Sequence, residues 1–164
     1  MAKEVEMKFL VDVSHPVVQE LRSKRGVAIS QGYLKSDATG VVRVRILDRQ
    51  GFLTIKGPSQ GISRDEFEYE IPFGDARMML DTMCQDVLHK TRYYHILPEG
   101  LTVELDVFSQ IDLVIAEIEF PDGIVPFNKP NWLLDYVSVD SRYYNNNILA
   151  AIAAGNVVAF PRRT

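Results

Sequence analysis

The feature that most constrains this chain is an alternation of charged and apolar residues that returns in one strand-length segment after another. The first instance is Glu4-Val5-Glu6-Met7-Lys8. Successive side chains of a β-strand point to opposite faces, so the three charged residues of this segment share one face and the apolar residues share the other. We expect strands of this kind at about 3–12, 27–35, 41–48, 52–57, 65–72, 87–97, 101–108 and 113–120.

Most of the charged faces carry charges of one sign, placed two residues apart. These pairs are Glu4 and Glu6, Arg43 and Arg45, Glu66 and Glu68, Lys90 and Arg92, Glu104 and Asp106, and Glu117 and Glu119. A sheet with one face in water is the simplest explanation of any single charged strand. Repeated like-sign pairs repel, however, unless opposite charges or a shared ligand compensate them. We therefore predict that the charged faces point into a closed barrel, since about eight strands leave room for side chains and one small ligand.

Short breaker sequences join the expected strands, as at Arg49-Gln50-Gly51 and Pro98-Glu99-Gly100. Connections this short favour antiparallel hairpins. The sequence thus predicts an α+β fold, a closed eight-stranded antiparallel β-barrel with a charged interior and helices packed on the outside. The length of 164 residues predicts a single domain over 1–164.

Four segments have helical character. They are a helix capped by Ser14 that runs from Pro16 toward Arg25, a helix over 75–86, a short helix over 131–136, and a helix over 146–154 that stops at Gly155. The apolar stripe expected for the second helix consists of Met78, Met79, Leu80 and Met83. Cys84 is expected to be buried in that helix, and Trp132 to anchor the third.

Composition excludes several functional classes. The net charge of −4 argues against a protein that coats DNA or RNA. Cys84 is the single cysteine, which rules out an intramolecular disulfide and suits a reducing compartment. No apolar segment has the length of a membrane span. We therefore expect a cytoplasmic protein that binds neither a nucleic acid polymer nor a membrane.

The two kinds of charge in the predicted interior suit two parts of one ligand. Carboxylate oxygens are ligands for hard divalent cations, and Mg²⁺ in particular binds one or two carboxylates together with substrate phosphates. Arginine and lysine side chains bind the phosphates themselves. A barrel that holds both sets of side chains predicts a site for a metal-bound polyphosphate.

The ordered series of charged strands resembles the CYTH superfamily, the triphosphate tunnel metalloenzymes, over nearly the whole chain. Glu4-x-Glu6-x-Lys8 is similar to the ExExK signature of that family. The other segments that carry the resemblance are Gln31-Gly-Tyr-Leu34, Val42-Arg-Val-Arg45, Leu53-Thr-Ile-Lys-Gly57, Arg64-x-Glu66-x-Glu68, Lys90-x-Arg92, Glu104-x-Asp106, Glu117-x-Glu119 and Asp140-Ser-Arg-Tyr-Tyr-Asn145.

The resemblance implies a role for each charged position. Mg²⁺ or Mn²⁺ would be held by Glu4, Glu6, Asp106, Glu117 and Glu119. The phosphates would be bound by Lys8, Arg43, Arg45, Lys56, Lys90 and Arg92. Tyr33 and Lys90 are the matching candidates for positioning the attacking water. Glu104 shares a face with Asp106, and of the two we rank Asp106 first as a metal ligand.

The function that the resemblance implies is metal-dependent hydrolysis of a short triphosphate, with inorganic tripolyphosphate as the favoured substrate. The alternatives are a class IV adenylate cyclase, a thiamine triphosphatase, and a non-catalytic module that binds polyphosphate or a nucleotide. The expected partner is the small triphosphate substrate, and a homodimer is possible.

Overall fold

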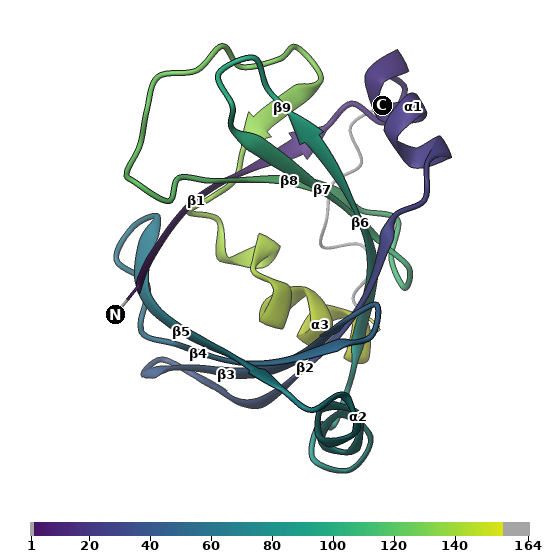
Figure 1. The fold of residues 1–164 in the computed structure, drawn as a ribbon, viewed down its shortest axis with the longest axis vertical. Coiled ribbons are helices and arrows are strands. Elements are labelled where there is room, and N and C mark those ends of the chain that lie inside the picture. Colours follow the sequence, from purple (N-terminus) through teal and green to yellow (C-terminus); the bar gives the residue numbers. More distant parts are fainter. Residues whose placement is uncertain (1, 156–164) are drawn as a thin grey trace.

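A single antiparallel barrel contains most of the chain. The computed structural model describes residues 2–155. Its strands are β1 (Ala2–Val11), β2 (Val27–Asp37), β3 (Gly40–Leu47), β4 (Gln50–Lys56), β5 (Ser63–Ile71), β6 (Leu88–Ile96), β7 (Thr102–Phe108), β8 (Val114–Glu119) and β9 (Leu133–Tyr136). The first eight pair in the order β5-β4-β3-β2-β6-β7-β8-β1, and pairing of β5 with β1 closes the ring (Figure 1). The predicted closed eight-stranded antiparallel barrel is confirmed.

The strand registers place the charged residues of neighbouring strands on one face. Glu6 lies opposite Glu119, and Lys8 lies opposite Glu117. In the pair formed by β6 and β7, Arg92 lies opposite Asp106. Residues paired across an antiparallel ladder point to the same side of the sheet, so these side chains all face the barrel interior.

The apolar faces of β1, β6, β7 and β8 form the main core outside the barrel. The helix α1 (Pro16–Ser23) and the strand β9 cover this surface, with the chain between β8 and β9. Val18 and Leu21 of α1 are buried against it. The helix begins at Pro16 as predicted, but its N-cap is His15 and not Ser14, since the His15 side chain accepts the Val17 backbone N–H at 3.3 Å. Ser14 instead binds Asp12.

The helix α2 (Phe73–Thr82) covers the outer face of β3 and β4, and the apolar stripe predicted for it is confirmed at Met79 and Leu80 but wrong at Met78 and Met83. Ala76 and Leu80 are the buried residues of this helix, whereas Met78 and Met83 are 66% and 64% exposed. The helix lies very close to the sheet at Gly51, where an added Cβ atom would be 2.7 Å from Ala76 Cβ. A helix this short and this close contacts the sheet along one narrow line that includes Ala76 and Leu80, so Met78 and Met83 lie on the exposed side. Cys84 follows the end of α2 and is half-buried.

The helix predicted over 131–136 is also wrong, since this segment contains strand β9. Strand β5 pairs with β1 only as far as Val5, which leaves the edge of β1 free further along. Strand β9 pairs there with Phe9 and Val11. Trp132 precedes β9 and is buried, with its ring edge-on to His95 at 5.7 Å. Local propensity at 131–136 is outweighed by a free strand edge that is distant in sequence.

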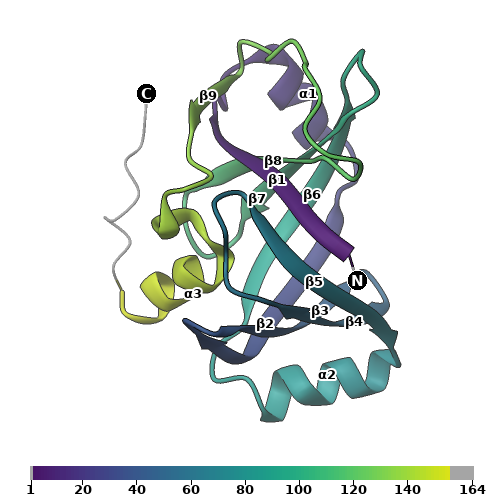
Figure 2. The same cartoon turned by 90° about the vertical axis from the view of Figure 1, so that its left-hand side faces the viewer.

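The third helix, α3 (Asn145–Ala153), confirms the prediction over 146–154, and Gly155 follows it with a φ of 73°. It lies across one end of the barrel (Figures 1 and 2). There Ile148 and Leu149 pack with Tyr143 and with apolar barrel residues, which are Leu10, Leu88, Phe108 and Ile115. Leu10 and Ile115 continue the inward rows of Lys8 and Glu117, so at this end the inward face is apolar.

Within residues 2–155 no helix has the length and apolar character that a membrane span requires.

Candidate active site

A cavity of about 260 Å³ occupies the barrel, and every strand of the barrel contributes to its wall. Eleven of the twelve residues that the sequence predicted for the site line it. They are Glu4, Glu6, Lys8, Tyr33, Arg43, Arg45, Lys56, Lys90, Arg92, Glu117 and Glu119. The structure thus brings together carboxylates and cations from distant parts of the chain.

Three carboxylates form a compact group that suits a cation. Oxygen atoms of Glu4, Glu6 and Glu119 lie within 4.8 Å of one another. Burial raises the pKa of Glu119, and repulsion from Glu6 and Glu4 raises it further. Carboxylates held at this spacing are ligands of the type and number that a hard divalent cation prefers. The donor set therefore fits Mg²⁺ or Mn²⁺.

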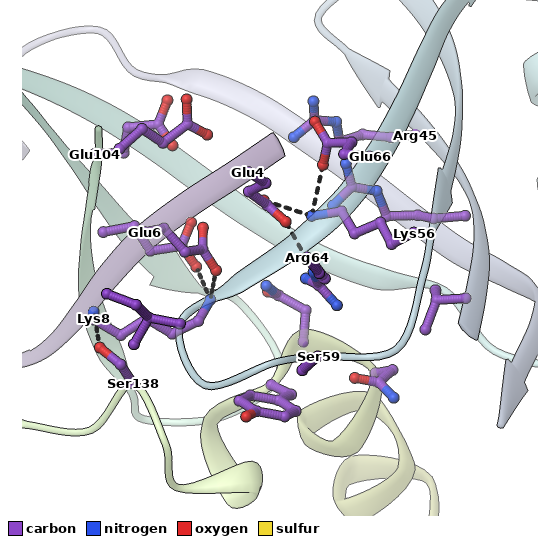
Figure 3. A pocket seen from close by; sticks show the side chains of 18 of the residues that line it. Glu4, Glu6, Lys8, Arg45, Lys56, Ser59, Arg64, Glu66, Glu104 and Ser138 are labelled. Atoms are coloured by element: carbon purple, nitrogen blue, oxygen red, sulfur yellow. Dashed lines mark hydrogen bonds and ion pairs between the residues drawn. The ribbon is translucent and has the colours of Figure 1, made fainter. Parts of the chain in front are cut away.

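Glu4 also belongs to a network of ion pairs with β4 and β5. Its carboxylate accepts hydrogen bonds from Lys56 Nζ at 2.7 Å and from Arg64 Nε at 2.8 Å. Lys56 binds Glu66 as well, at 2.9 Å (Figure 3). Burial opposes ionisation of Glu4, but the two cations more than offset it and lower the pKa to about 2. Glu4 is therefore an anion at any physiological pH.

Lys8 joins the first and last strands of the barrel. Its Nζ lies 2.8 Å from Glu6 and 2.7 Å from Glu117. Burial alone would lower the pKa of Lys8, but these two carboxylates raise it above its ordinary value. Lys8 is therefore a fixed positive charge, and its backbone N–H donates to the hydroxyl of Ser138 at 2.7 Å.

Lys90 differs from Lys8 in the direction in which its surroundings shift the pKa. Its ammonium is buried and donates to Asp106 Oδ2 at 2.6 Å and to Asn145 Oδ1 at 3.1 Å. Burial lowers the pKa of Lys90 to about 8, since Asp106 offsets the desolvation only in part and Arg92 adds repulsion. Burial, rather than the charge of the neighbouring Arg92, is the main cause of this lowered pKa.

Asp106 is the predicted site residue that does not line the cavity. It is fully buried, and Arg92 and Lys90 bind its two oxygens. These cations lower the pKa of Asp106 despite its burial. Glu104 does line the cavity, and burial with repulsion from Glu117 and Glu119 raises its pKa to about 7 despite the Arg92 charge. The sequence ranked Asp106 before Glu104 as a metal ligand, but in the structure Glu104 lines the cavity and Asp106 does not.

Arg43 and Arg45 share one carboxylate. Glu68 Oε2 lies 3.4 Å from Arg43 Nη2 and 3.1 Å from Arg45 Nη2, and it accepts the Thr54 hydroxyl at 2.7 Å. Arg43 Nε and Arg45 Nε are buried, and no residue within 2–155 forms a hydrogen bond with either atom. One carboxylate balances one of the two guanidinium charges, so these residues bring net positive charge to the cavity wall for an anionic ligand.

Tyr33 lies in the wall near these cations. Its hydroxyl accepts a hydrogen bond from Gln31 Nε2 at 2.9 Å. Burial raises the pKa of Tyr33 even though Arg43 lies nearby. The phenol therefore stays protonated and is a hydrogen-bond donor to the cavity.

The cavity also includes residues that the sequence analysis did not select. They come from the turn after β4 and from the chain around α3, and include Ser59, Ser138, Tyr144, Asn145 and Asn146. Tyr144 and Asn145 belong to the closing motif, so their position in that motif was the one available signal. The hydroxyls of Ser59 and Ser138 carry no pattern that distinguishes them from other loop serines.

The sequence profile of the CYTH domain matches residues 2–145. The chain belongs to the CYTH family. Two relatives, each named inorganic triphosphatase, support this assignment. The relative from Acetivibrio thermocellus is 45% identical over 152 residues, which are 91% of this chain and 94% of the relative. The relative from Nitrosomonas europaea is 34% identical over 154 residues, which are 91% of this chain and 98% of the relative.

Solved structures of CYTH-like proteins show the same fold. A structure described as an inorganic triphosphatase is 29% identical, with a TM-score of 0.58 over 91% of this chain and 95% of its own. A structure from Bacillus halodurans, described as a putative adenylate cyclase, has a TM-score of 0.56 at 15% identity and covers 100% of this chain and 96% of its own. At that identity the second likeness concerns the fold alone.

Proposed function

We propose that this CYTH protein hydrolyses a phosphoanhydride bond of inorganic tripolyphosphate in a metal-dependent reaction. The observation that carries the proposal is the division of one cavity into a carboxylate group and a set of lysines and arginines. The names of the two relatives point to the same substrate class. Phosphoryl transfer needs positioning and charge neutralisation more than covalent chemistry, and this wall supplies both.

Glu4, Glu6 and Glu119 would hold Mg²⁺ or Mn²⁺ at one side of the cavity. When bound, the metal would supply charge neutralisation at the phosphate oxygens. Glu104 is better placed than Asp106 to join this group, since Glu104 lines the cavity and Asp106 is bound by cations beneath the wall. Glu117 binds Lys8 and Arg92, which suits a role in orienting cations.

The basic residues would bind the phosphates from several sides. Arg43 and Arg45 line the cavity and share the single carboxylate of Glu68, and Lys8 is a fixed charge. Lys90 can exchange a proton near neutral pH, because burial lowers its pKa to about 8. Lys90 would therefore deprotonate or orient the attacking water, with the Tyr33 hydroxyl as a hydrogen-bond donor beside it.

One assay panel tests the proposal. The purified protein is incubated with tripolyphosphate, ATP or thiamine triphosphate, each with Mg²⁺ or Mn²⁺, and the products are resolved into phosphate, pyrophosphate and cyclic AMP. We expect phosphate and pyrophosphate from tripolyphosphate as the dominant reaction, and at least a ~100-fold loss of kcat in Lys90→Ala. Cyclic AMP from ATP would show that the protein is a cyclase. Faster release of phosphate from thiamine triphosphate than from tripolyphosphate would make thiamine triphosphate the substrate. Binding of these compounds without turnover would show that the protein is a binding module.

We further propose a surface for the homodimer that the sequence allowed. Leu34, Ile55, Phe67 and Tyr69 are 36–57% exposed, and Ile55 lies opposite Phe67 on the outer face of β4 and β5. Exposed apolar side chains that gather on one face mark interaction sites, and a stable two-fold contact buries about 800 Å² per copy. Sedimentation of the wild type and Phe67→Glu checks this, since a wild-type monomer would contradict it.

A single CYTH domain over 1–164 and a location in the cytoplasm remain proposals from the sequence.

A further inference from the structure

The start of helix α3 contacts the most deeply buried lysine of the cavity. Asn145 is the first residue of the helix, and its Oδ1 accepts a hydrogen bond from Lys90 Nζ at 3.1 Å. The orientation of the amide follows from chemistry, because an ammonium has no acceptor and so must face the amide oxygen. Of the three consecutive asparagines at 145–147, Asn145 is the last residue of the closing motif, and Asn146 and Asn147 lie outside that motif.

The hydrogen bonds of Lys90 leave one direction open. An ammonium has three N–H donors. Asp106 Oδ2 takes one at 2.6 Å and Asn145 Oδ1 takes a second. Among the described residues no third acceptor binds Lys90 Nζ, and Lys90 lines the cavity. With two positions held by fixed acceptors, the third position of the nitrogen, whether N–H or lone pair, is left to the cavity and to the Phe108 ring, whose centroid lies 5.6 Å from Nζ.

Asn145 is held on a rigid support. Asn146 Nδ2 donates to Ser36 Oγ at the end of β2 at 2.9 Å, which ties the start of the helix to the barrel. One turn further, Ile148 and Leu149 are buried in the apolar end of the barrel with Leu88. Side chains placed by packed elements keep their geometry within the tolerance that phosphoryl transfer requires.

We propose that Asn145 is a positioning residue, which acts on the triphosphate reaction by fixing the direction of the Lys90 side-chain nitrogen. Asp106 alone would allow the nitrogen to rotate about one contact, since a single hydrogen bond leaves the other two positions free to turn. The second contact removes that freedom. The proposal rests on the proposed function, because it assumes that Lys90 faces the phosphates or the attacking water.

The kinetic test compares Asn145→Ala with Asn147→Ala. Asn147 carries the same amide on the same helix, but it is exposed and binds Ser141 O outside the cavity. We expect Asn145→Ala to lower kcat at least about tenfold while KM changes less than about threefold, as for the loss of a hydrogen bond to a charged group. Asn147→Ala is expected to stay within about twofold of the wild type. Equal losses in both variants, or no loss in Asn145→Ala, would overturn the proposal.

A double-mutant cycle separates positioning from direct contact with the substrate. In the Lys90→Ala background, followed with enzyme in excess, Asn145→Ala should cause no further loss, because the group through which it acts is gone. An undiminished tenfold loss in that background would mean that Asn145 binds the substrate itself, and would overturn the proposal.

A third measurement does not depend on activity. In NMR spectra of metal-free protein with ¹⁵N-labelled lysine at pH 6, the Lys90 ammonium signal is assigned by its absence in Lys90→Arg, with Lys8 and Lys56 as internal references. We expect Asn145→Ala to shift or broaden this signal, and Asn145→Asp, which keeps an acceptor oxygen, to retain it. An unchanged signal in Asn145→Ala would refute the contact. If the wild type cleaves no triphosphate, the proposed function fails, whereas this spectrum still tests the geometry.

Discussion

The two ends of the barrel use the same strands and the same inward face for opposite purposes. Along β1 the inward residues change from Glu4, Glu6 and Lys8 to Leu10, and along β8 they change from Glu119 and Glu117 to Ile115. The apolar end is covered by α3 (Figure 2), while the carboxylates gather toward the other end. Charged side chains in this barrel therefore stay where a ligand, water or an ion-pair partner can compensate them, and the inward face under α3 is apolar. The comparison predicts that substitutions at the charged end impair chemistry and that substitutions at the apolar end impair folding.

The largest effect is expected at the carboxylate group. Glu6→Ala should lower kcat for tripolyphosphate by about a thousandfold, or ~4 kcal/mol, because a metal ligand is lost. The melting temperature should change little, since the substitution removes a carboxylate that repels Glu119 while Lys8 keeps Glu117 as its partner. Steady-state kinetics and thermal melting provide the two readouts. The matched control is Glu20→Ala on the exposed side of α1, and a loss in kcat smaller than about tenfold in Glu6→Ala would contradict the metal assignment.

The next effect concerns the apolar end. Ile148 is fully buried against the barrel, so Ile148→Ala should lower the free energy of unfolding by about 2–4 kcal/mol through lost burial and a new cavity. Denaturation in urea measures the change. Ala150 lies on the exposed side of the same helix, and Ala150→Ser should change stability by less than about 1 kcal/mol. Equal stability of Ile148→Ala and the wild type would mean that α3 does not support the fold.

A smaller effect should depend on pH. Burial and neighbouring carboxylates raise the pKa of Glu104 from 4.5 to about 7. Between these values the folded protein keeps a proton that the unfolded chain releases, so rising pH lowers the free energy of unfolding, by up to about 1–3 kcal/mol. Denaturation of metal-free protein in EDTA at pH 5 and pH 8 should show this loss in the wild type and a smaller one in Glu104→Gln. Identical pH dependence of the two proteins would show that Glu104 titrates normally.

The smallest effect is expected outside the barrel, away from both ends. Met78 is 66% exposed, so Met78→Gln should change the free energy of unfolding by less than about 0.5 kcal/mol and leave kcat unchanged. In contrast, Leu80→Gln on the buried side of α2 should be strongly destabilising. If Met78→Gln were as destabilising as Leu80→Gln, Met78 would lie on the buried side of α2, as the sequence predicted.

The charge periodicity of the sequence predicts the barrel and most of the residues in its wall. The period of two in the charge pattern assigns Glu4, Glu6 and Lys8 to one face before any contact is known, and antiparallel hairpins leave few ways to arrange such strands. The sequence could not separate Asp106 from Glu104, since both point inward on β7 and only the cations around Asp106 make the difference.

The pairing of β9 and the packing of the helices depend on contacts between distant segments, which the sequence pattern does not predict. Strand β9 exists because an edge of β1 is left free, and the buried face of α2 follows from its close approach to Gly51. The contact between Asn145 and Lys90 joins residues 55 positions apart. Periodicity is a local property that can be recognised from neighbouring residues. These contacts instead depend on how distant segments pack against one another, and that packing depends on the whole chain.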